Sequence, residues 1–124
     1  MNIDNINIIV LAYLGDSVYE LYIRNKLIES GIQKVELLQK SATKYVSAKG
    51  QANILTYLID NNILTNEELD IVKRGRNYKR SSHPKNTDII TYKHSTGFEA
   101  LIGYLYLSNN KERLYEILNN IEVK

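Results

Sequence analysis

The 124-residue chain contains no cysteine, no tryptophan and a single proline. Without cysteine, disulfide scaffolds, cysteine nucleophiles, thiolate zinc sites and iron–sulfur clusters are excluded together. No apolar run reaches the roughly 18 to 20 residues that a membrane span requires. The first residues include Asp4 and Asp16 and lack a basic stretch, so we expect no signal peptide. We therefore expect a cytoplasmic protein whose residues 1–124 form a single domain.

The chain also has little net charge, but that charge is unevenly distributed. The formal value is +2, which is too small to attract a polyanion by itself. Residues 73–94, which we call the basic segment, carry seven cations and one anion, whereas the remaining residues carry nine cations and thirteen anions. The cations of the basic segment are Lys73, Arg74, Arg76, Lys79, Arg80, Lys85 and Lys93. This asymmetry favours an anionic partner, with a solvated run of surface charge as the alternative.

Apolar residues recur at helical spacing, and no stretch alternates with the period of a strand. The spacing predicts an all-α fold of about five helices, at about 8–30, 35–60, 65–75, 88–108 and 111–122. Gly31 is expected to end the first helix, and Gly50 is expected at a close helix contact or a slight break within the second. Thr65 is expected to begin the third helix in a capping box with Glu68. In the first helix, the predicted core-facing residues are Val10, Tyr13, Leu14, Val18, Leu21, Tyr22 and Leu27. Residues 75–86 have the composition of a surface loop.

Two carboxylates, Asp16 and Glu99, lie in the most apolar parts of their helices, where an unpaired buried charge is costly. Small neighbours such as Gly15 and Gly97 would let two helices approach and bring the carboxylates together. Oxygen ligands from two rigid elements suit Mg²⁺, which keeps several waters and often shares its coordination with phosphate. The alternative is that each residue is an ordinary helix-surface or capping carboxylate.

The remaining polar residues indicate less. Glu20 follows Asp16 by one helical turn and either joins the same face or pairs with Arg24. His83 and His94 form no familiar zinc spacing. The six glycines are isolated from one another, so no phosphate-binding loop is predicted. The ten tyrosines lie mostly at core-facing spacings and are interpreted as packing residues with polar tips.

Several of these segments match a known family. The segment LGDSV at 14–18 resembles the signature helix of the ribonuclease III catalytic domain, and FEALIG at 98–103 resembles its second acidic helix. The segments at 45–52, 73–77, 84–88 and 92–96 are similar to the Mini-ribonuclease III subfamily in particular. Members of that subfamily consist of the catalytic domain without a double-stranded RNA-binding domain. The resemblance covers nearly the whole chain.

The resemblance implies a homodimeric, Mg²⁺-dependent endoribonuclease that cleaves double-stranded RNA and leaves 5′-phosphate and 3′-hydroxyl ends. It implies that Asp16 is the catalytic residue and that Glu99 is a metal ligand, so that both belong to the metal site and the catalytic pair. The expected substrate is the precursor of 23S ribosomal RNA. A ribosomal protein bound to that substrate is a further candidate partner.

Given this resemblance, we expect the basic segment to bind RNA. Duplex RNA is recognised mainly through its shape, its 2′-hydroxyls and its phosphates, so a basic surface is needed more than base-specific side chains. We expect Lys73, Arg74, Arg76, Lys79, Arg80 and Lys85 to contact the duplex beside the cut. Lys93 and His94 precede Glu99 by one to two turns and are expected nearer the scissile phosphate.

The chain departs from the full-length enzymes at two positions. Ala12 stands where they have a glutamate four residues before the signature aspartate, and Thr96 stands where they have an aspartate three residues before the second-helix glutamate. Thr96 and Glu20 are retained as candidate residues behind the metal ligands. Because half of the usual set of four carboxylates is absent, the alternative function is a catalytically weak or inactive RNA-binding module for ribosome assembly.

Overall fold

The computed structural model describes residues 2–79, 85 and 87–124. The elements, in chain order, are η1 (Ile3–Asn5), α1 (Ile8–Glu29), α2 (Val35–Val46), α3 (Ala48–Asp60), α4 (Asn66–Arg76), α5 (Ile89–Leu107) and α6 (Lys111–Leu118). Within these described ranges there is no strand, which confirms the all-α prediction. In the same part of the chain, every helix is too short or too polar to cross a membrane.

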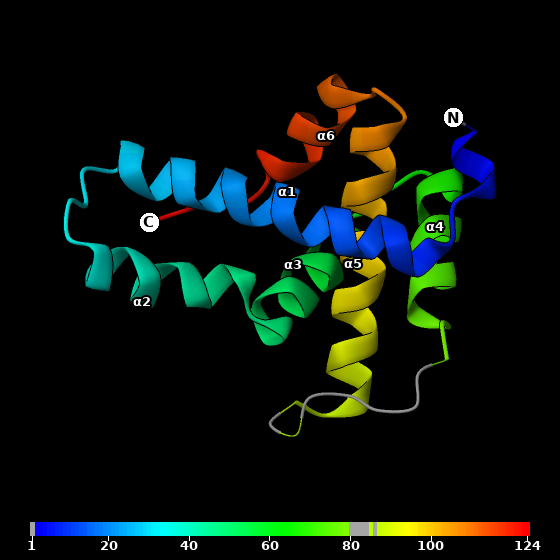
Figure 1. Cartoon of the computed structure of the whole chain (residues 1–124), viewed down its shortest axis with the longest axis horizontal. Coiled ribbons are helices and arrows are strands. Elements are labelled where there is room, and N and C mark those ends of the chain that lie inside the picture. The colour runs from blue at the N-terminus through cyan, green and yellow to red at the C-terminus, as the bar shows by residue number, and fades with distance from the viewer. Residues whose placement is uncertain (1, 80–84, 86) are drawn as a thin grey trace.

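Helix α5 is the centre of the molecule, and α1, α3, α4 and α6 pack against it (Figure 1). The N-terminal half of α1 crosses α5 near the middle of α5, while α4 lies along one side of α5 and α3 along another. Helix α2 runs back beside the second half of α1, and α6 covers the C-terminal end of α5. The most extensive contact between two helices is therefore the one between α1 and α5.

Tyrosine hydroxyls tie α1 to its neighbours. The ring of Tyr19 meets Phe98 of α5 edge to face, with centroids 4.9 Å apart. Its hydroxyl donates to the backbone carbonyl of Tyr45 on α2, at 2.9 Å. The hydroxyl of Tyr22 donates to the side-chain oxygen of Asn119, at 2.9 Å. Both rings are buried while both hydroxyls are paired, so these two tyrosines have the packing role predicted from the sequence. The prediction is wrong for the exposed tyrosines, which are Tyr13, Tyr57, Tyr106 and Tyr115.

The buried face of α1 differs from the predicted one. Val10, Tyr13 and Leu21 are 50%, 81% and 62% exposed, although their spacing predicted burial. The residues that α1 buries are Ile8, Leu11, Ala12, Gly15, Tyr19, Tyr22, Ile23 and Leu27. Because α1 carries apolar side chains on almost every side, helical periodicity alone could not distinguish its core face from its outer face.

The helix predicted over 35–60 is two helices that meet at Ser47. The extended backbone of Ser47, with φ −65° and ψ 160°, ends α2, and its side chain accepts the backbone N–H of Gly50 to cap α3. A β-carbon on Gly50 would overlap the backbone carbonyl of Lys44, so only glycine permits this tight turn between the helices. The first turn of α3 is therefore held directly against the end of α2.

Other helix ends agree with the sequence. Thr65 and Glu68 form the expected capping box at the start of α4. Gly31 has a φ of +99° immediately after α1, in the left-handed region that favours glycine. Helix α4 continues through Gly75 to Arg76, slightly beyond its predicted end. Gly75 is buried because α4 and α5 approach closely there, and an added β-carbon would lie 2.9 Å from the Cα of Gly97.

A buried ion pair fastens α6 to α4. The Arg113 guanidinium donates through Nε to one carboxylate oxygen of Glu68 and through Nη2 to the other, both at 2.7 Å. Nη2 also donates to the backbone carbonyl of Ile63, at 2.7 Å. The same carboxylate accepts the Thr65 backbone N–H of the capping box, so one side chain serves both the helix cap and the contact between helices.

Candidate active site

The candidate site lies where α1 and α5 touch through glycines. A β-carbon on Gly15 of α1 would overlap the backbone carbonyl oxygen of Glu99 on α5. A β-carbon on Gly103 of α5 would overlap the carbonyl oxygen of Leu11 on α1. The two backbones are therefore in contact on both sides of the crossing, as close as helices lacking side chains at these points can come. Gly97, which was expected beside this contact, packs instead against Val72 of α4.

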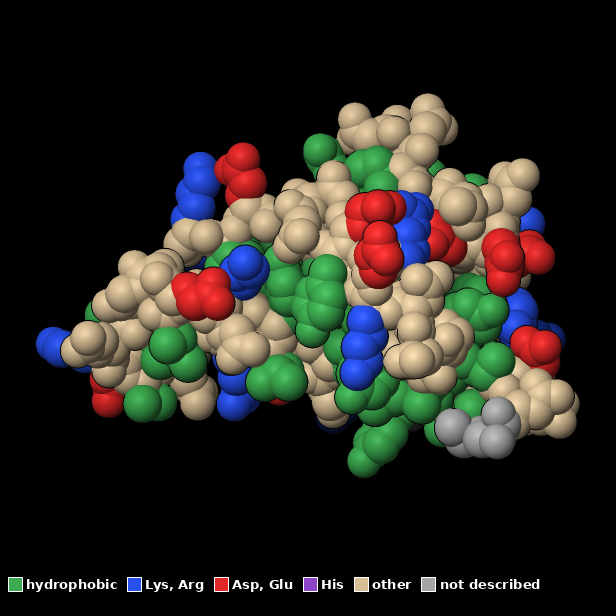
Figure 2. Space-filling view, turned by 90° about the horizontal axis from the view of Figure 1, so that it is seen from above, with side chains coloured by type: hydrophobic (Ala, Val, Ile, Leu, Met, Phe, Trp, Pro, Cys, Tyr) green, Lys and Arg blue, Asp and Glu red, His purple; other side chains and the backbone are tan. Residues whose placement is uncertain are grey.

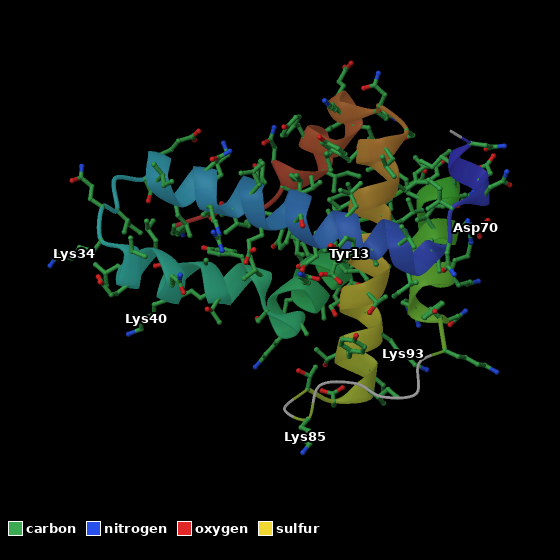
Figure 3. All side chains as sticks on the ribbon, in the orientation of Figure 1. Tyr13, Lys34, Lys40, Asp70, Lys85 and Lys93 are labelled. Carbon is green, nitrogen blue, oxygen red and sulfur yellow. The ribbon has the colours of Figure 1, made fainter. Side chains whose placement is uncertain are left out.

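This crossing brings the two predicted carboxylates to one pocket. Asp16 and Glu99 both line an open pocket of about 380 Å³, together with Ile9, Val10, Ala12 and Tyr13. Figure 3 shows Tyr13 at the point where α1 passes over α5. Residues that are 83 positions apart in the sequence therefore share one surface depression. The pocket is open to solvent.

The burial of the two carboxylates differs from the expectation. Asp16 is exposed and Glu99 is half-buried, although both were expected in apolar surroundings. Asp16 lies on the outer side of α1, on which Tyr13 is also exposed, whereas Gly15 faces α5. The charge of Asp16 therefore faces water and needs no buried cation to compensate it.

Glu99 has a partner that the sequence analysis did not identify. The side-chain amide of Gln51, on the first turn of α3, donates from Nε2 to Oε2 of Glu99 at 3.3 Å. The sequence did contain one signal for it: Gln51 precedes Leu55 and Leu58 by four and seven residues, a polar side chain at a core-facing position. A third helix thus contributes to the pocket formed by α1 and α5.

The residues of the pocket fit a Mg²⁺ site in which the protein supplies few of the ligands. Two carboxylates from two rigid helices face an open depression, which leaves room for waters and phosphate oxygens to complete an octahedron. Among the described residues, no group of three or more potential ligand side chains gathers at one place. Ala12 lines the pocket and contributes no oxygen there. Asp16 and Glu99 would therefore be the ligands that one chain supplies.

The two candidate residues behind the ligands have other contacts. Glu20 pairs with Arg24 at 3.5 Å, the ion pair that was one of the two alternatives for it. Thr96 is buried, and its hydroxyl donates to the backbone carbonyl of Tyr92, at 3.0 Å. The backbone carbonyl of Thr96 faces Gly75, which places this residue at the contact between α5 and α4.

The basic segment surrounds the end of the molecule at which α4 ends and α5 begins. Lys73, Arg74 and Arg76 lie in the last turns of α4, and Lys93 and His94 lie in the first turns of α5. Lys79 and Lys85 are exposed between the two helices, and Arg80 lies outside the described residues. Figure 3 shows Lys85 and Lys93 on the same end of the molecule, below the crossing.

Two of these side chains are partly engaged within the protein. Arg76 is half-buried, and a β-carbon on Gly97 would lie 2.9 Å from its Cγ, so its aliphatic stem packs on α5. His94 places Nδ1 2.8 Å from the carbonyl oxygen of Ile90, one turn earlier. Because a carbonyl can only accept, this nitrogen carries the proton in that contact. The exposed lysines are the freer cations.

The face on the α6 side of the molecule has a different charge pattern. Seen from above, acidic and basic side chains lie next to one another there (Figure 2). Arg113 pairs with both Glu68 and Glu116 in this region. The uncompensated positive charge of the chain is therefore associated with the end that carries the basic segment.

The comparison with protein families agrees with the all-helical fold. The model of the ribonuclease III domain matches residues 9–110, a range that includes nearly all of α1, the whole of α5, both carboxylates and the basic segment. This match over most of the all-helical chain identifies it as a domain of the ribonuclease III type.

Individual relatives narrow the assignment. The chain is 54% identical to Mini-ribonuclease 3 of Brevibacillus brevis over 90% of this chain and 82% of that protein. It is 45% identical to Mini-ribonuclease 3 of Streptococcus pneumoniae over 96% and 93%. A crystal structure of a Fusobacterium nucleatum protein matches with a TM-score of 0.82 and 34% identity, over 93% of this chain and 90% of that one. The chain therefore belongs to the Mini-ribonuclease III group of the ribonuclease III family of endoribonucleases.

Proposed function

We propose that this single-domain chain is a Mg²⁺-dependent endoribonuclease that cleaves double-stranded RNA in the cytoplasm. The observation that carries the proposal is the meeting of Asp16 and Glu99 on one open pocket at the crossing of α1 and α5. Membership of the Mini-ribonuclease III group supports the substrate class. The specific substrate that we propose is the 23S ribosomal RNA precursor. A ribosomal protein bound to that precursor is a further component of the proposal.

In this proposal Asp16 and Glu99 orient the reacting phosphate. Their carboxylates would hold a Mg²⁺ ion from two helices that are fixed against each other at Gly15 and Gly103. When bound, Mg²⁺ supplies the Lewis acid that polarises the phosphodiester and lowers the pKa of water. Attack by water at phosphorus with departure of the 3′ oxygen then gives a 5′-phosphate and a 3′-hydroxyl end.

The basic segment binds the duplex on either side of the cut. Lys73, Arg74, Lys79, Lys85 and Lys93 are exposed at one end of the molecule, where they can neutralise phosphates without reading bases. Shape-based contacts of this kind suit A-form RNA, because its major groove is too deep and narrow for side chains to contact the bases. Arg76, Arg80 and His94 complete the proposed RNA-binding set.

The proposed active form is a homodimer. The outer side of α1 exposes large apolar side chains beside the pocket, among them Val10 and Tyr13, which a second copy would cover. A two-fold axis matches the symmetry of a duplex and places one pocket on each strand. It also doubles the basic surface that the duplex meets.

A catalytically inactive RNA-binding module for ribosome assembly is the second candidate. Two observations favour it: Ala12 contributes no carboxylate to the pocket, and the Thr96 hydroxyl is turned to the backbone of its own helix. Such a module would retard duplex RNA in a gel and would leave its length unchanged in the presence of Mg²⁺.

Incubation of the protein with labelled duplex RNA tests the proposal. We expect cleavage with Mg²⁺, none with EDTA, and a loss of at least about 10³-fold in rate for Asp16→Asn. That variant should keep its helical circular dichroism and its affinity for the duplex, because Asp16 is exposed and makes no part of the core. The matched control is Asp60→Asn, at the exposed end of α3. Binding of intact RNA by the unchanged protein under all conditions would favour the second candidate.

A further inference from the structure

Gln51 is a buried polar side chain in contact with the candidate site. It is 2% exposed, and its amide nitrogen Nε2 lies 3.3 Å from Oε2 of Glu99 and 3.2 Å from the backbone carbonyl oxygen of Val46. Val46 is the last residue of α2, Gln51 belongs to the first turn of α3, and Glu99 lies in α5. One amide therefore joins three helices at the edge of the pocket.

The orientation of this amide is fixed by its partners. A carboxylate and a backbone carbonyl both accept hydrogen bonds, so the nitrogen must face them and the amide cannot be turned over. The amide oxygen Oε1 is then left buried, without a hydrogen-bond donor among the described residues. A buried acceptor without a donor destabilises the folded state, and native proteins contain few of them.

The backbone at the junction of α2 and α3 places Gln51 in this position. The break at Ser47 leaves the carbonyl of Val46 available as an anchor for the amide. The close approach of Gly50 to the carbonyl of Lys44 then fixes the first turn of α3 against α2. With the amide anchored at Val46, its second N–H is directed at Glu99 and not at solvent.

An apolar residue of similar size would fill the same volume without burying an unpaired oxygen. Contact with Val46 alone therefore does not account for a glutamine at this position, whereas contact with a metal ligand does. Groups that hydrogen-bond to metal ligands fix the orientation of those ligands, and their loss commonly weakens metal binding by roughly 10- to 100-fold.

We infer that Gln51 is a positioning residue that holds the Glu99 carboxylate in the orientation required for binding the divalent ion. The inference rests on the proposed function, because it assigns Glu99 to the metal site. Gln51 itself touches neither the ion nor the substrate. Its amide hydrogen-bonds to one carboxylate oxygen and so restricts the rotation of the Glu99 carboxylate, which lines the same pocket as Asp16.

The test compares Gln51→Met, which keeps the length of the side chain, with Gln39→Met on the exposed side of α2 as the matched control. Titration of each protein with Mn²⁺, followed by electron paramagnetic resonance, gives metal affinity without RNA. We expect Gln51→Met to bind Mn²⁺ about 10-fold more weakly or worse, with an unchanged or higher melting temperature in EDTA. The control should match the unchanged protein in both measurements.

The dependence of cleavage on Mg²⁺ concentration is a second measurement, and it would not change if Gln51 had only a structural role. The Mg²⁺ concentration that gives half-maximal cleavage should rise by a similar factor in Gln51→Met, while the rate at saturating Mg²⁺ returns to near that of the unchanged protein. Gln51→Leu should behave in the same way, so a folding failure of one variant leaves the other to decide.

Two results would overturn the inference, and they are distinguishable from each other. Equal Mn²⁺ affinity in Gln51→Met and the unchanged protein, or a fall in melting temperature alone, would make Gln51 structural while leaving the proposed function intact. Absence of Mn²⁺ binding and of cleavage in the unchanged protein would overturn the proposed function, and the inference with it.

Discussion

Glu68 is a carboxylate almost removed from water, with 8% of its side chain exposed. Burial by itself would raise its pKa, but hydrogen bonds from Arg113 and from the Thr65 backbone hold the pKa below its ordinary value of 4.5. A depressed pKa means that, in acid, the unfolded chain binds a proton more readily than the folded protein does. The resulting stabilisation is fully present above about pH 4.5 and is lost as the pH falls through the folded-state pKa.

Replacement of Glu68 by Gln should therefore matter at neutral pH and much less in acid. At pH 7 we expect Glu68→Gln to lower the free energy of unfolding by about 2 kcal/mol, because hydrogen bonds to a charged group become neutral ones. At pH 3 the difference from the unchanged protein should shrink. Urea unfolding at both pH values measures it, with the exposed Glu112→Gln as control. An equal difference at both pH values would contradict this account.

The sequence predicted the two residues of the candidate site that lie in local motifs. It did not predict the third residue, which comes from a distant part of the chain. Asp16 and Glu99 were identified from their apolar neighbours and from the resemblance, and the pocket contains both. Gln51 contacts Glu99 across 48 positions of sequence, and its role depends on a helix break at Ser47. No local sequence pattern predicts a contact between residues so far apart in the chain. The polar Gln51 at a core-facing position was only a partial indication.

At the scale of the helices, the crossing of α1 and α5 depends on two positions without side chains. Gly15 and Gly103 each face a backbone carbonyl of the opposite helix. Backbone atoms cannot rotate out of the way as the end of a flexible side chain can. Any β-carbon must therefore push the helices apart, and the pocket residues on α1 and α5 move with them.

Gly15→Ala tests this contact. Alanine favours helices intrinsically, yet here we expect it to lower the free energy of unfolding by about 3 kcal/mol, at the upper end of the usual cost of overpacking. Cleavage should fall as well, since Asp16 would shift away from Glu99. Urea unfolding and the cleavage assay measure the two effects, with Ser17→Ala on the exposed side of α1 as control. A loss below about 0.5 kcal/mol would show that the helices can separate freely.

The helices themselves were predicted where local chemistry marks their ends. The capping box at Thr65 and the glycine at Gly31 act within a few residues, so the sequence displays them directly. A close contact or slight break was expected at Gly50, but a full division into two helices at Ser47 was not, because the apolar periodicity continues across it and no proline interrupts it. The core face of α1 was wrong because tertiary packing, and not periodicity, selects among its apolar sides.

At the scale of the whole molecule, the uneven charge predicted from the sequence is also uneven in space. The cations of the basic segment come from the end of α4, the start of α5 and the residues between them, and these meet at one end of the fold. Other lysines lie elsewhere. Lys34 directly precedes α2 and Lys40 lies on α2, and both are far from the basic segment (Figure 3). The chain thus provides two lysine pairs of equal charge in different places.

These pairs give a matched test of the RNA-binding surface. We expect Lys85→Ala with Lys93→Ala to weaken binding of duplex RNA, while Lys34→Ala with Lys40→Ala leaves it nearly unchanged. Removal of each lysine that neutralises a phosphate should lower the slope of log affinity against log salt by roughly one, so a homodimer, which carries every substitution twice, should show a decrease of about four. Gel retardation at several salt concentrations measures both quantities, and sedimentation gives the oligomeric state. A decrease of about two would indicate a monomer on RNA, and equal slopes for the two pairs would show that the basic segment is ordinary solvated charge.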